Sequence, residues 1–263
     1  MKLLNKKTLG KVCHIGCLVL TGLFAQTMNA GSGAAWSYSG ETGPEHWGDL
    51  SPAYAKCKTG REQSPVDLNA AWIDDENELT LKSRFKPVPL TVVNNGHTVQ
   101  VNIDNESYTK TERGRQRLLQ FHFHSLSEHT INGQSFPLEA HFVHIDDDGV
   151  LSVLGVLFSL GDENETLKSI LAIAPKHKGE ATAKGVELNP KRLLGSSETE
   201  SYYRLQGSLT TPPCSEEVNW YVSTEIQQLS SSQFKQFQKL FHGGNARPVQ
   251  PLFERQAVLR MDD

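Results

Sequence analysis

The chain has 263 residues, of which 37% are hydrophobic and 21% are charged, and its 26 basic and 30 acidic residues give a formal net charge of −4. This composition is typical of a folded globular protein and excludes disordered and fibrous proteins. The acidic balance also argues against a nucleic-acid partner, because proteins that bind nucleic acids carry basic faces that displace counterions from phosphates.

Residues 1–30 are predicted to be an export signal that is cleaved from the mature protein. Four lysines and an apolar run of fourteen residues, Val12–Ala25, are followed by Met28-Asn29-Ala30 as a cleavage site. We prefer cleavage to membrane anchoring because a spanning helix needs about 20 apolar residues. No later segment is long and apolar enough to span a membrane, and loss of the four lysines takes the net charge from −4 to −8.

Cleavage would leave Cys57 and Cys214 as the only cysteines of the mature chain. Disulfides persist in the oxidising compartments that exported proteins enter. We therefore expect a single Cys57–Cys214 bridge, the alternative being two separate buried thiols.

Residues 31–263 are expected to form one domain that is mainly β with short helices, because neither a repeat nor a linker tract interrupts them. Five segments have the residue preferences of strands: Leu90–Val93, Thr98–Ile103, Leu118–His124, Leu138–Ile145 and Val150–Leu160. Turn residues, Asn94-Asn95-Gly96 and Asp147-Asp148-Gly149, separate successive members. The pattern predicts consecutive β-hairpins.

Two later segments have the spacing of helices. The first carries apolar residues three and four positions apart: Leu167, Ile170, Leu171 and Ala174. In the second, Ser230 and Gln233 form a capping pattern before three phenylalanines, Phe234, Phe237 and Phe241. We assign these phenylalanines to the core rather than to a binding site.

The segment Gln120–His124 indicates a metal site. Strand alternation sends His122 and His124 to one face and the intervening phenylalanines to the other. On the next predicted strand, the same alternation places Glu139 and His141 on one face and His144 on the opposite one. Three neutral imidazoles suit Zn²⁺ and leave a coordination position for water, as a catalytic site requires.

The spacing alone does not choose the third ligand. His141 and His144 are both available, and four further histidines remain candidates: His46, His129, His177 and His242. Glu139 favours His141, because a carboxylate on the same face can orient a zinc-bound imidazole.

Eight ordered motifs resemble those of α-class carbonic anhydrases: Gly43-Pro44-Glu45-His46-Trp47, Gln63-Ser64-Pro65-Val66-Asp67, Asn94-Asn95-Gly96-His97, Gln120–His124, Ser127-Glu128-His129-Thr130, Glu139–His144, Ser208-Leu209-Thr210-Thr211-Pro212-Pro213 and Arg247-Pro248. They are distributed over nearly the whole mature chain. The resemblance implies a single domain around a large, mostly antiparallel twisted sheet. It also implies reversible hydration of CO₂ to bicarbonate and a proton, with ester hydrolysis as a side activity.

The resemblance implies one zinc ion per chain on three histidines, His122, His124 and His141. Gln120 and Glu139 would accept hydrogen bonds from the first and third imidazoles. The backbone carbonyl of Asn245 would accept one from the second. These acceptors would fix the orientation of each ligand.

The resemblance further implies the roles of the residues around the ion. Thr210 would accept a hydrogen bond from zinc-bound hydroxide, the attacking group, and donate its own proton to Glu128. Thr211 would meet bicarbonate, and an apolar wall would hold CO₂: Val143, Val153, Leu209 and Trp220. His97 would be the proton shuttle, with Tyr38 near its water chain.

The segment Ser125-Leu126-Ser127-Glu128 is compact, as in bacterial members of the class, where animal members carry a longer insertion. Cys57 and Cys214 also match the disulfide of the secreted and bacterial branches. Together with the export signal, these features favour the periplasm of a Gram-negative bacterium over secretion.

Two alternative functions are a binding module that has lost the catalytic chemistry and a zinc-scavenging protein. The intact motif residues argue against the first, and the lack of a His-rich tract argues against the second.

Overall fold

A computed structural model describes residues 34–69, 72–74, 80–196 and 198–260 of the chain. The predicted export signal lies outside the described residues. Within them, no helix is both long enough and apolar enough to cross a membrane.

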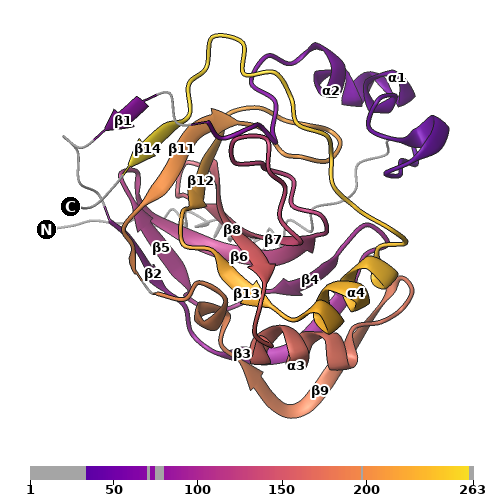
Figure 1. The fold of residues 1–263 in the computed structure, drawn as a ribbon, viewed down its shortest axis with the longest axis vertical. Helices are drawn as coiled ribbons and strands as arrows, with labels where there is room; N and C mark the ends of the chain where they lie inside the picture. Colours follow the sequence, from indigo (N-terminus) through magenta and orange to yellow (C-terminus); the bar gives the residue numbers. More distant parts are fainter. Residues whose placement is uncertain (1–33, 70–71, 75–79, 197, 261–263) are drawn as a thin grey trace, which may run out of the picture. The chain divides into compact units, whose positions relative to one another are not determined.

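Fourteen strands form one mixed, mostly antiparallel sheet in the part of the chain that the structure describes (Figure 1). They are β1 (Trp72–Asp74), β2 (Leu81–Arg84), β3 (Val88–Asn94), β4 (Val99–Asn102), β5 (Tyr108–Thr111), β6 (Gly114–His124), β7 (Leu138–Ile145), β8 (Leu151–Leu160), β9 (Gly179–Leu188), β10 (Glu198–Thr199), β11 (Tyr202–Gly207), β12 (Val218–Ser223), β13 (Gln227–Leu229) and β14 (Val258–Arg260). The main path runs β1-β14-β11-β12-β8-β7-β6-β4-β3-β9. Strands β1 and β14 pair in parallel, as β8 does with β12 and β13.

The helices are short, as predicted. They are η1 (Gly40–Thr42), α1 (Trp47–Leu50), η2 (Pro52–Tyr54), α2 (Lys56–Thr59), α3 (Glu165–Ile173), η3 (Pro190–Leu193) and α4 (Ser231–Leu240). In Figure 1, α3 and α4 lie side by side near β3, and α3 contacts β3 and β9. The prediction of a mainly β fold with short helices is confirmed.

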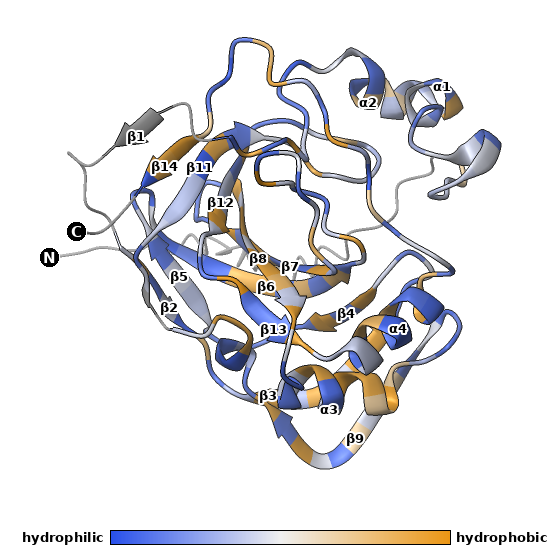
Figure 2. Cartoon of the chain, in the orientation of Figure 1, coloured by the Kyte–Doolittle hydropathy of each residue, from blue (hydrophilic) through white to orange (hydrophobic). Residues whose placement is uncertain are grey.

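All five predicted strands are present, as β3, β4, β6, β7 and β8, and both predicted turns connect them. Several strands were not predicted, among them β9, whose residues are mostly exposed. A strand with so few buried hydrophobic residues lacks the period-2 hydrophobic pattern on which the prediction depends. Figure 2 shows the contrast between hydrophobic β8 and the mixed colouring of β9.

Along β6, alternate side chains point to opposite faces of the sheet, with the phenylalanines in the hydrophobic core and the histidines on the other face. Phe121 and Phe123 are fully buried in the main hydrophobic cluster, and Phe142 of β7 packs 5.3 Å from the ring of Phe121. Phe237 of α4 closes over Phe123 at 5.2 Å between ring centroids. The imidazoles of β6 therefore point to the other face of the sheet.

The predicted capping box at the start of α4 is present. Gln233 donates its backbone N–H to the Ser230 hydroxyl, and Ser230 donates its own N–H to the Gln233 side chain. Such a cap stabilises a helix by about 1 kcal/mol. Phe237 and Phe241 are buried and Phe234 packs against them, which confirms their assignment to the core.

The predicted Cys57–Cys214 disulfide is also present and joins α2 to the segment before β12. The bridge closes a loop between residues 157 positions apart. In the loop-entropy model, such a closure destabilises the unfolded chain by about 5 kcal/mol.

Candidate metal centre

The pairing of β6 with β7 brings three histidines together. His122 lies directly opposite His141, and His124 lies opposite Glu139. The ring centroids of the three imidazoles are 4.5 to 5.3 Å apart. One nitrogen from each ring lies within 4.8 Å of the other two, which is the spacing of ligands around one metal ion.

Two of these imidazoles are oriented by neutral acceptors. His122 donates from Nδ1 to Oε1 of Gln120 at 2.8 Å, and His124 donates from Nδ1 to the backbone carbonyl of Asn245 at 2.8 Å. These bonds leave Nε2 of each ring as the free nitrogen. Nε2 of His124 is buried and has no hydrogen-bond partner among the described residues.

His141 is oriented by a carboxylate. It donates from Nε2 to Oε1 of Glu139 at 2.9 Å, which leaves its Nδ1 free. The same oxygen accepts from Nδ1 of His129 at 2.8 Å, while Oε2 accepts the backbone N–H groups of Glu128 and His129, both at 2.9 Å. His129, Glu139 and His141 are also close enough to hold an ion. Because four donors already occupy the two carboxylate oxygens, we assign this group to orientation instead.

The electrostatics of the centre favour neutral imidazoles at His122 and His124 and an ionised carboxylate at Glu139. Burial lowers the pKa of His122 well below its ordinary value, and the neighbouring imidazoles of His124 and His141 lower it further. Burial opposes ionisation of Glu139, yet His129 and His141 hold its pKa well below the usual range. For His141, burial is outweighed by Glu139, and the pKa is raised.

Gly155 makes room for the orienting carboxylate. It lies on β8 directly opposite His141. A Cβ at this position would stand 3.0 Å from Oε1 of Glu139, closer than such contacts normally allow. We infer that a larger residue here would displace the Glu139 side chain.

The carboxylate of Glu128 lies at the centre and has no hydrogen bond to Thr210. Oε1 of the buried Glu128 accepts the backbone N–H of Arg247 at 2.8 Å, and Oε2 has no partner among the described residues. The carboxylate faces the imidazoles, with 3.4 Å from Oε1 to Nδ1 of His124 and 3.9 Å from Oε2 to Nδ1 of His141. The expected bond from Thr210 to Glu128 is therefore not formed in this structure, although Thr210 is 95% buried and Oε2 is an available acceptor.

An apolar wall adjoins the histidines on three neighbouring strands. Val143 of β7 lies opposite Val153 of β8, which lies opposite Trp220 of β12. The Trp220 ring is 4.8 Å from that of His141, and its Nε1 donates to a backbone carbonyl at 2.9 Å. Leu209 packs against the same cluster, and Thr211 is half-buried in the following turn. The predicted wall residues thus share one cluster beside the imidazoles.

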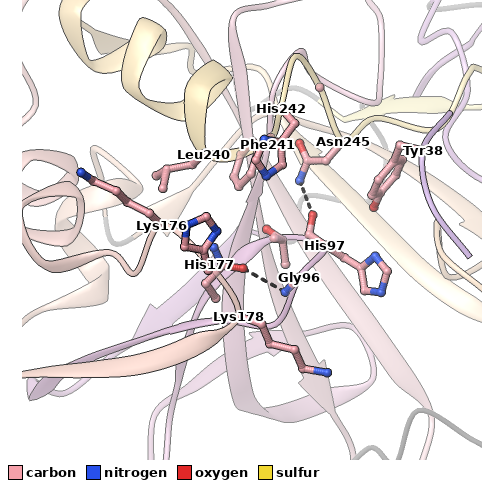
Figure 3. A pocket seen from close by; sticks show the side chains of 13 residues that line it. Tyr38, Gly96, His97, Lys176, His177, Lys178, Leu240, Phe241, His242 and Asn245 are labelled. Atoms are coloured by element: carbon pink, nitrogen blue, oxygen red, sulfur yellow. Dashed lines mark hydrogen bonds between the residues drawn. The ribbon is translucent and has the colours of Figure 1, made fainter. Parts of the chain in front are cut away.

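His97 lies in the turn between β3 and β4 and belongs to neither metal-binding group found among the described residues. Its ring stacks on Trp36 at 3.7 Å between centroids and 9° between planes, and Trp36 also contacts Tyr38 at 5.4 Å. Burial and the charge of Lys178 lower the pKa of His97. Its backbone carbonyl accepts from Nδ2 of Asn245, so one residue connects this turn to His124 (Figure 3).

The remaining candidate histidines lie elsewhere. His144 points to the opposite face of β7, where its Nε2 lies 3.0 Å from the hydroxyl of Thr109, and burial lowers its pKa to about 4. His46, His177 and His242 are exposed and belong to neither metal-binding group found among the described residues.

Sequence reasoning did not single out Trp36, and it named Arg247 only as part of a motif without assigning it a role. Trp36 carries the stacked His97, and the alternating aromatics Trp36 and Tyr38 were the available signal. Arg247 is buried, donates to Gln63, Ser64 and Cys57, and fixes Glu128 through its backbone N–H. Burial lowers the pKa of Arg247 to about 10. These contacts connect the disulfide-bonded helix to the centre.

Comparison with known proteins gives consistent results. A family model described as eukaryotic-type carbonic anhydrase matches residues 42–260. Two similar proteins are carbonic anhydrases: that of Nostoc sp. is 37% identical over 98% of this chain and 95% of its own, and that of Pectobacterium atrosepticum is 39% identical over 89% and 94%. The solved α-carbonic anhydrase of Thermovibrio ammonificans, in complex with the inhibitor sulfanilamide, is 44% identical over 86% of this chain and 99% of its own, with a TM-score of 0.80.

Proposed function

The chain belongs to the eukaryotic-type carbonic anhydrase family and hydrates CO₂ reversibly to bicarbonate and a proton, and we propose that it uses one zinc ion held by His122, His124 and His141. The three histidines are typical of the zinc site of this family. The free nitrogens fit the ion: each ring donates outward from one nitrogen and keeps the other unprotonated. When bound, zinc is a redox-inert Lewis acid that lowers the pKa of a coordinated water to about 7, the reference value established for carbonic anhydrase itself.

Gln120, Glu139 and Asn245 hold the ligands in place. Each accepts the outward N–H of one imidazole at 2.8 to 2.9 Å, so the tautomer and the ring orientation are set before the ion binds. The carboxylate also makes His141 a more basic ligand than a neutral acceptor would.

The apolar wall of Val143, Val153, Leu209 and Trp220 binds CO₂. This substrate has no net charge, so an apolar surface suits it better than a polar one. The hydroxyl of Thr211 meets the oxygens of bicarbonate, where charge develops during the reaction.

Thr210 and Glu128 orient the attacking oxygen. We assign the Thr210 hydroxyl to accept a hydrogen bond from this oxygen and to donate its own proton to Oε2 of Glu128. The buried, unpartnered Oε2 supports this role, because such an acceptor is costly to leave unsatisfied. A lone pair of the attacking oxygen is then directed toward CO₂.

His97 transfers the product proton toward solvent. A half-buried imidazole can accept a proton near neutral pH and release it to a buffer. Tyr38 is assigned to the water chain that leads to His97, and both residues lie at the same side of the cavity in Figure 3.

The mature domain, residues 31–263, is proposed to act in the periplasm of a Gram-negative bacterium after loss of residues 1–30. The Cys57–Cys214 disulfide supports export to an oxidising compartment. N-terminal sequencing of the protein from an osmotic-shock fraction tests this proposal. A start at residue 31 or within a few positions supports it, and an intact Met1 contradicts it.

The observation that supports the proposed chemistry is that each of the three imidazoles donates a hydrogen bond from one ring nitrogen, so that the other nitrogen of each ring is free to bind the ion. The test is stopped-flow CO₂ hydration by the mature protein, with zinc measured on the same sample. We expect one zinc ion per chain and a hydration rate that is lost on chelation and restored by zinc. A full complement of zinc without hydration would indicate a binding module. Hydrolysis of an activated ester, which the same nucleophile should catalyse slowly, provides a second readout.

A further inference from the structure

The turn that carries His97 is attached to β6 at the residue between two of the proposed metal ligands. The register of β4 on β6 ends at the pair Gln100–His122, so backbone pairing between these strands does not extend to Phe123. Beyond that end, the Thr98 hydroxyl donates to the backbone carbonyl of Phe123 at 2.6 Å and accepts its N–H at 3.3 Å. The Thr98 side chain, in a residue that is only 8% exposed, therefore continues the connection where the ladder stops.

Asn245 reinforces this connection from the C-terminal segment. Its Nδ2 donates to the carbonyl of Phe123 at 2.9 Å and to that of His97 at 3.0 Å, and its own backbone carbonyl accepts from Nδ1 of His124. Figure 3 shows the bond between the Asn245 amide and the His97 carbonyl. The Phe123 carbonyl thus accepts two hydrogen bonds, one from Thr98 in the turn and one from the residue that orients His124.

The turn is also held internally. Oδ1 of Asn95 accepts the backbone N–H groups of His97 and Thr98 at 2.8 and 2.9 Å, and the Asn95 N–H donates to the Thr98 carbonyl at 3.2 Å. A turn with these bonds moves as a unit, so its contacts with β6 set the position of the His97 backbone relative to the ligand strand.

We propose that Thr98 is a positioning residue for proton transfer, whose hydroxyl holds the His97 backbone at a fixed distance from the ligand strand. The proposal rests on the proposed role of His97 as the proton shuttle. Proton transfer between two groups through water requires that both groups keep their separation, whereas attack on CO₂ does not involve the turn. Among the described residues, the Thr98 hydroxyl bonds only backbone groups, so it acts through the position of its neighbour.

Thr98→Val tests the hydroxyl with little change in the shape of the side chain. In CO₂ hydration by the zinc-loaded enzyme, kcat at low buffer concentration should fall by about threefold or more, and kcat/KM should change by less than about twofold. Imidazole in solution should restore most of the loss in kcat. Thr98→Ser keeps the hydroxyl and should retain the parent kcat, whereas Thr98→Ala, a second variant without the hydroxyl, should repeat the loss.

A double-variant cycle shows whether Thr98 acts through His97. In the His97→Ala background, Thr98→Val should leave the remaining kcat unchanged, because the group that it positions is absent. An equal loss in both backgrounds would contradict the proposal. Thr109→Val is the matched control: it removes another buried hydroxyl, bonded to Ser83 and His144 on the packing face, and should not alter kcat in either background.

Amide hydrogen exchange provides a readout that does not depend on activity. Thr98→Val removes the acceptor of the Phe123 N–H, so exchange of this amide, measured by NMR, should become about tenfold faster or more than in the parent. Thr98→Ser should exchange as slowly as the parent. An unchanged rate in Thr98→Val would show that the hydroxyl does not hold the turn on β6.

Three activity results would overturn the proposal: an unchanged kcat in Thr98→Val, an equal loss in Thr98→Ser, or a fall in kcat/KM as large as that in kcat without rescue by imidazole. Failure of the proposed function would appear differently, as a lack of zinc or hydration in the parent enzyme or as a kcat that His97→Ala does not lower. The two failures are therefore distinguishable.

Discussion

Two buried histidines on opposite faces of β7 have pKa values shifted in opposite directions. His141 faces the metal centre, donates to the Glu139 carboxylate at 2.9 Å and has a raised pKa. His144, three positions later, is buried on the other face beside Thr109 and has a pKa lowered to about 4. Burial opposes the charged form of both rings, so the neighbouring partner decides the difference.

The position of a histidine along β7 decides which face of the sheet its side chain lies on. The hydrogen-bond partners on that face then decide the orientation and the pKa of the imidazole. On the packing face, His144 lies beside one aromatic ring, that of Phe85, with 6.0 Å between the ring centroids. On the metal face, each imidazole instead donates to a fixed acceptor. The same alternation therefore produces a core on one side and, on the other, a group of three histidines typical of the zinc site of this family.

Removal of one hydroxyl on each face should have different consequences. Thr210→Ala should lower kcat/KM for CO₂ by about 10²- to 10³-fold, because in the proposed mechanism the attacking oxygen loses its orienting group. Added buffer should not restore the loss. Thr109→Ala, the control on the packing face, should leave kcat/KM unchanged and lower the free energy of unfolding by about 1 kcal/mol. A similar fall in kcat/KM for both variants would remove the distinction between the faces.

The buried His144 should make stability depend on pH. Its folded pKa of about 4 lies below the ordinary value of 6.5, so the unfolded chain binds the proton more readily. The resulting stabilisation is complete above pH 6.5 and is lost as the pH falls toward 4, with a total of ~3 kcal/mol. Urea unfolding of the parent and of His144→Gln at pH 7 and 5 measures it. The free energy of unfolding should fall less with pH in the variant; an equal fall would show that His144 does not contribute.

Glu139→Gln tests whether the carboxylate that orients His141 contributes to zinc affinity. The substitution retains the size of the side chain but removes the charge that orients His141 and His129. Zinc should dissociate about 10- to 100-fold more readily in competition with a chelator. Glu112→Gln, a control outside the centre, removes a carboxylate that accepts from Arg204 and Tyr221 and should leave zinc affinity unchanged. Unaltered affinity in Glu139→Gln would contradict the orienting role.

His97→Ala should have the smallest effect and one confined to proton transfer. We expect kcat at low buffer concentration to fall by about tenfold, while zinc content and most of kcat/KM are retained. Imidazole in solution should restore much of the loss. A fall in kcat/KM as severe as that of Thr210→Ala, without rescue, would make His97 a structural or substrate-binding residue.

The ligand strands could be predicted because their signals are local. The alternation in Gln120–His124 and in Glu139–His144 is read from adjacent residues, and both strands are present with the expected faces. The turn before His97 and the capping box of α4 were predictable for the same reason.

The contacts that hold Glu128 and His97 in place could not be predicted from adjacent residues. The bond from Arg247 to Glu128 joins residues 119 positions apart, and the Trp36 ring meets His97 only after the chain has folded. The expected Thr210–Glu128 bond came from the family resemblance and is not formed here, where Oε2 of Glu128 faces His141. Strand β9 was missed because most of its residues are exposed.

The most direct test of the account is zinc stoichiometry and CO₂ hydration, measured on the same samples of His141→Ala and His144→Ala. We predict that His141→Ala loses most of its zinc and its activity, whereas His144→Ala keeps about one zinc ion per chain and hydrates CO₂. The reverse pattern, with zinc retained in His141→Ala and lost in folded His144→Ala, would contradict the assignment of the metal face.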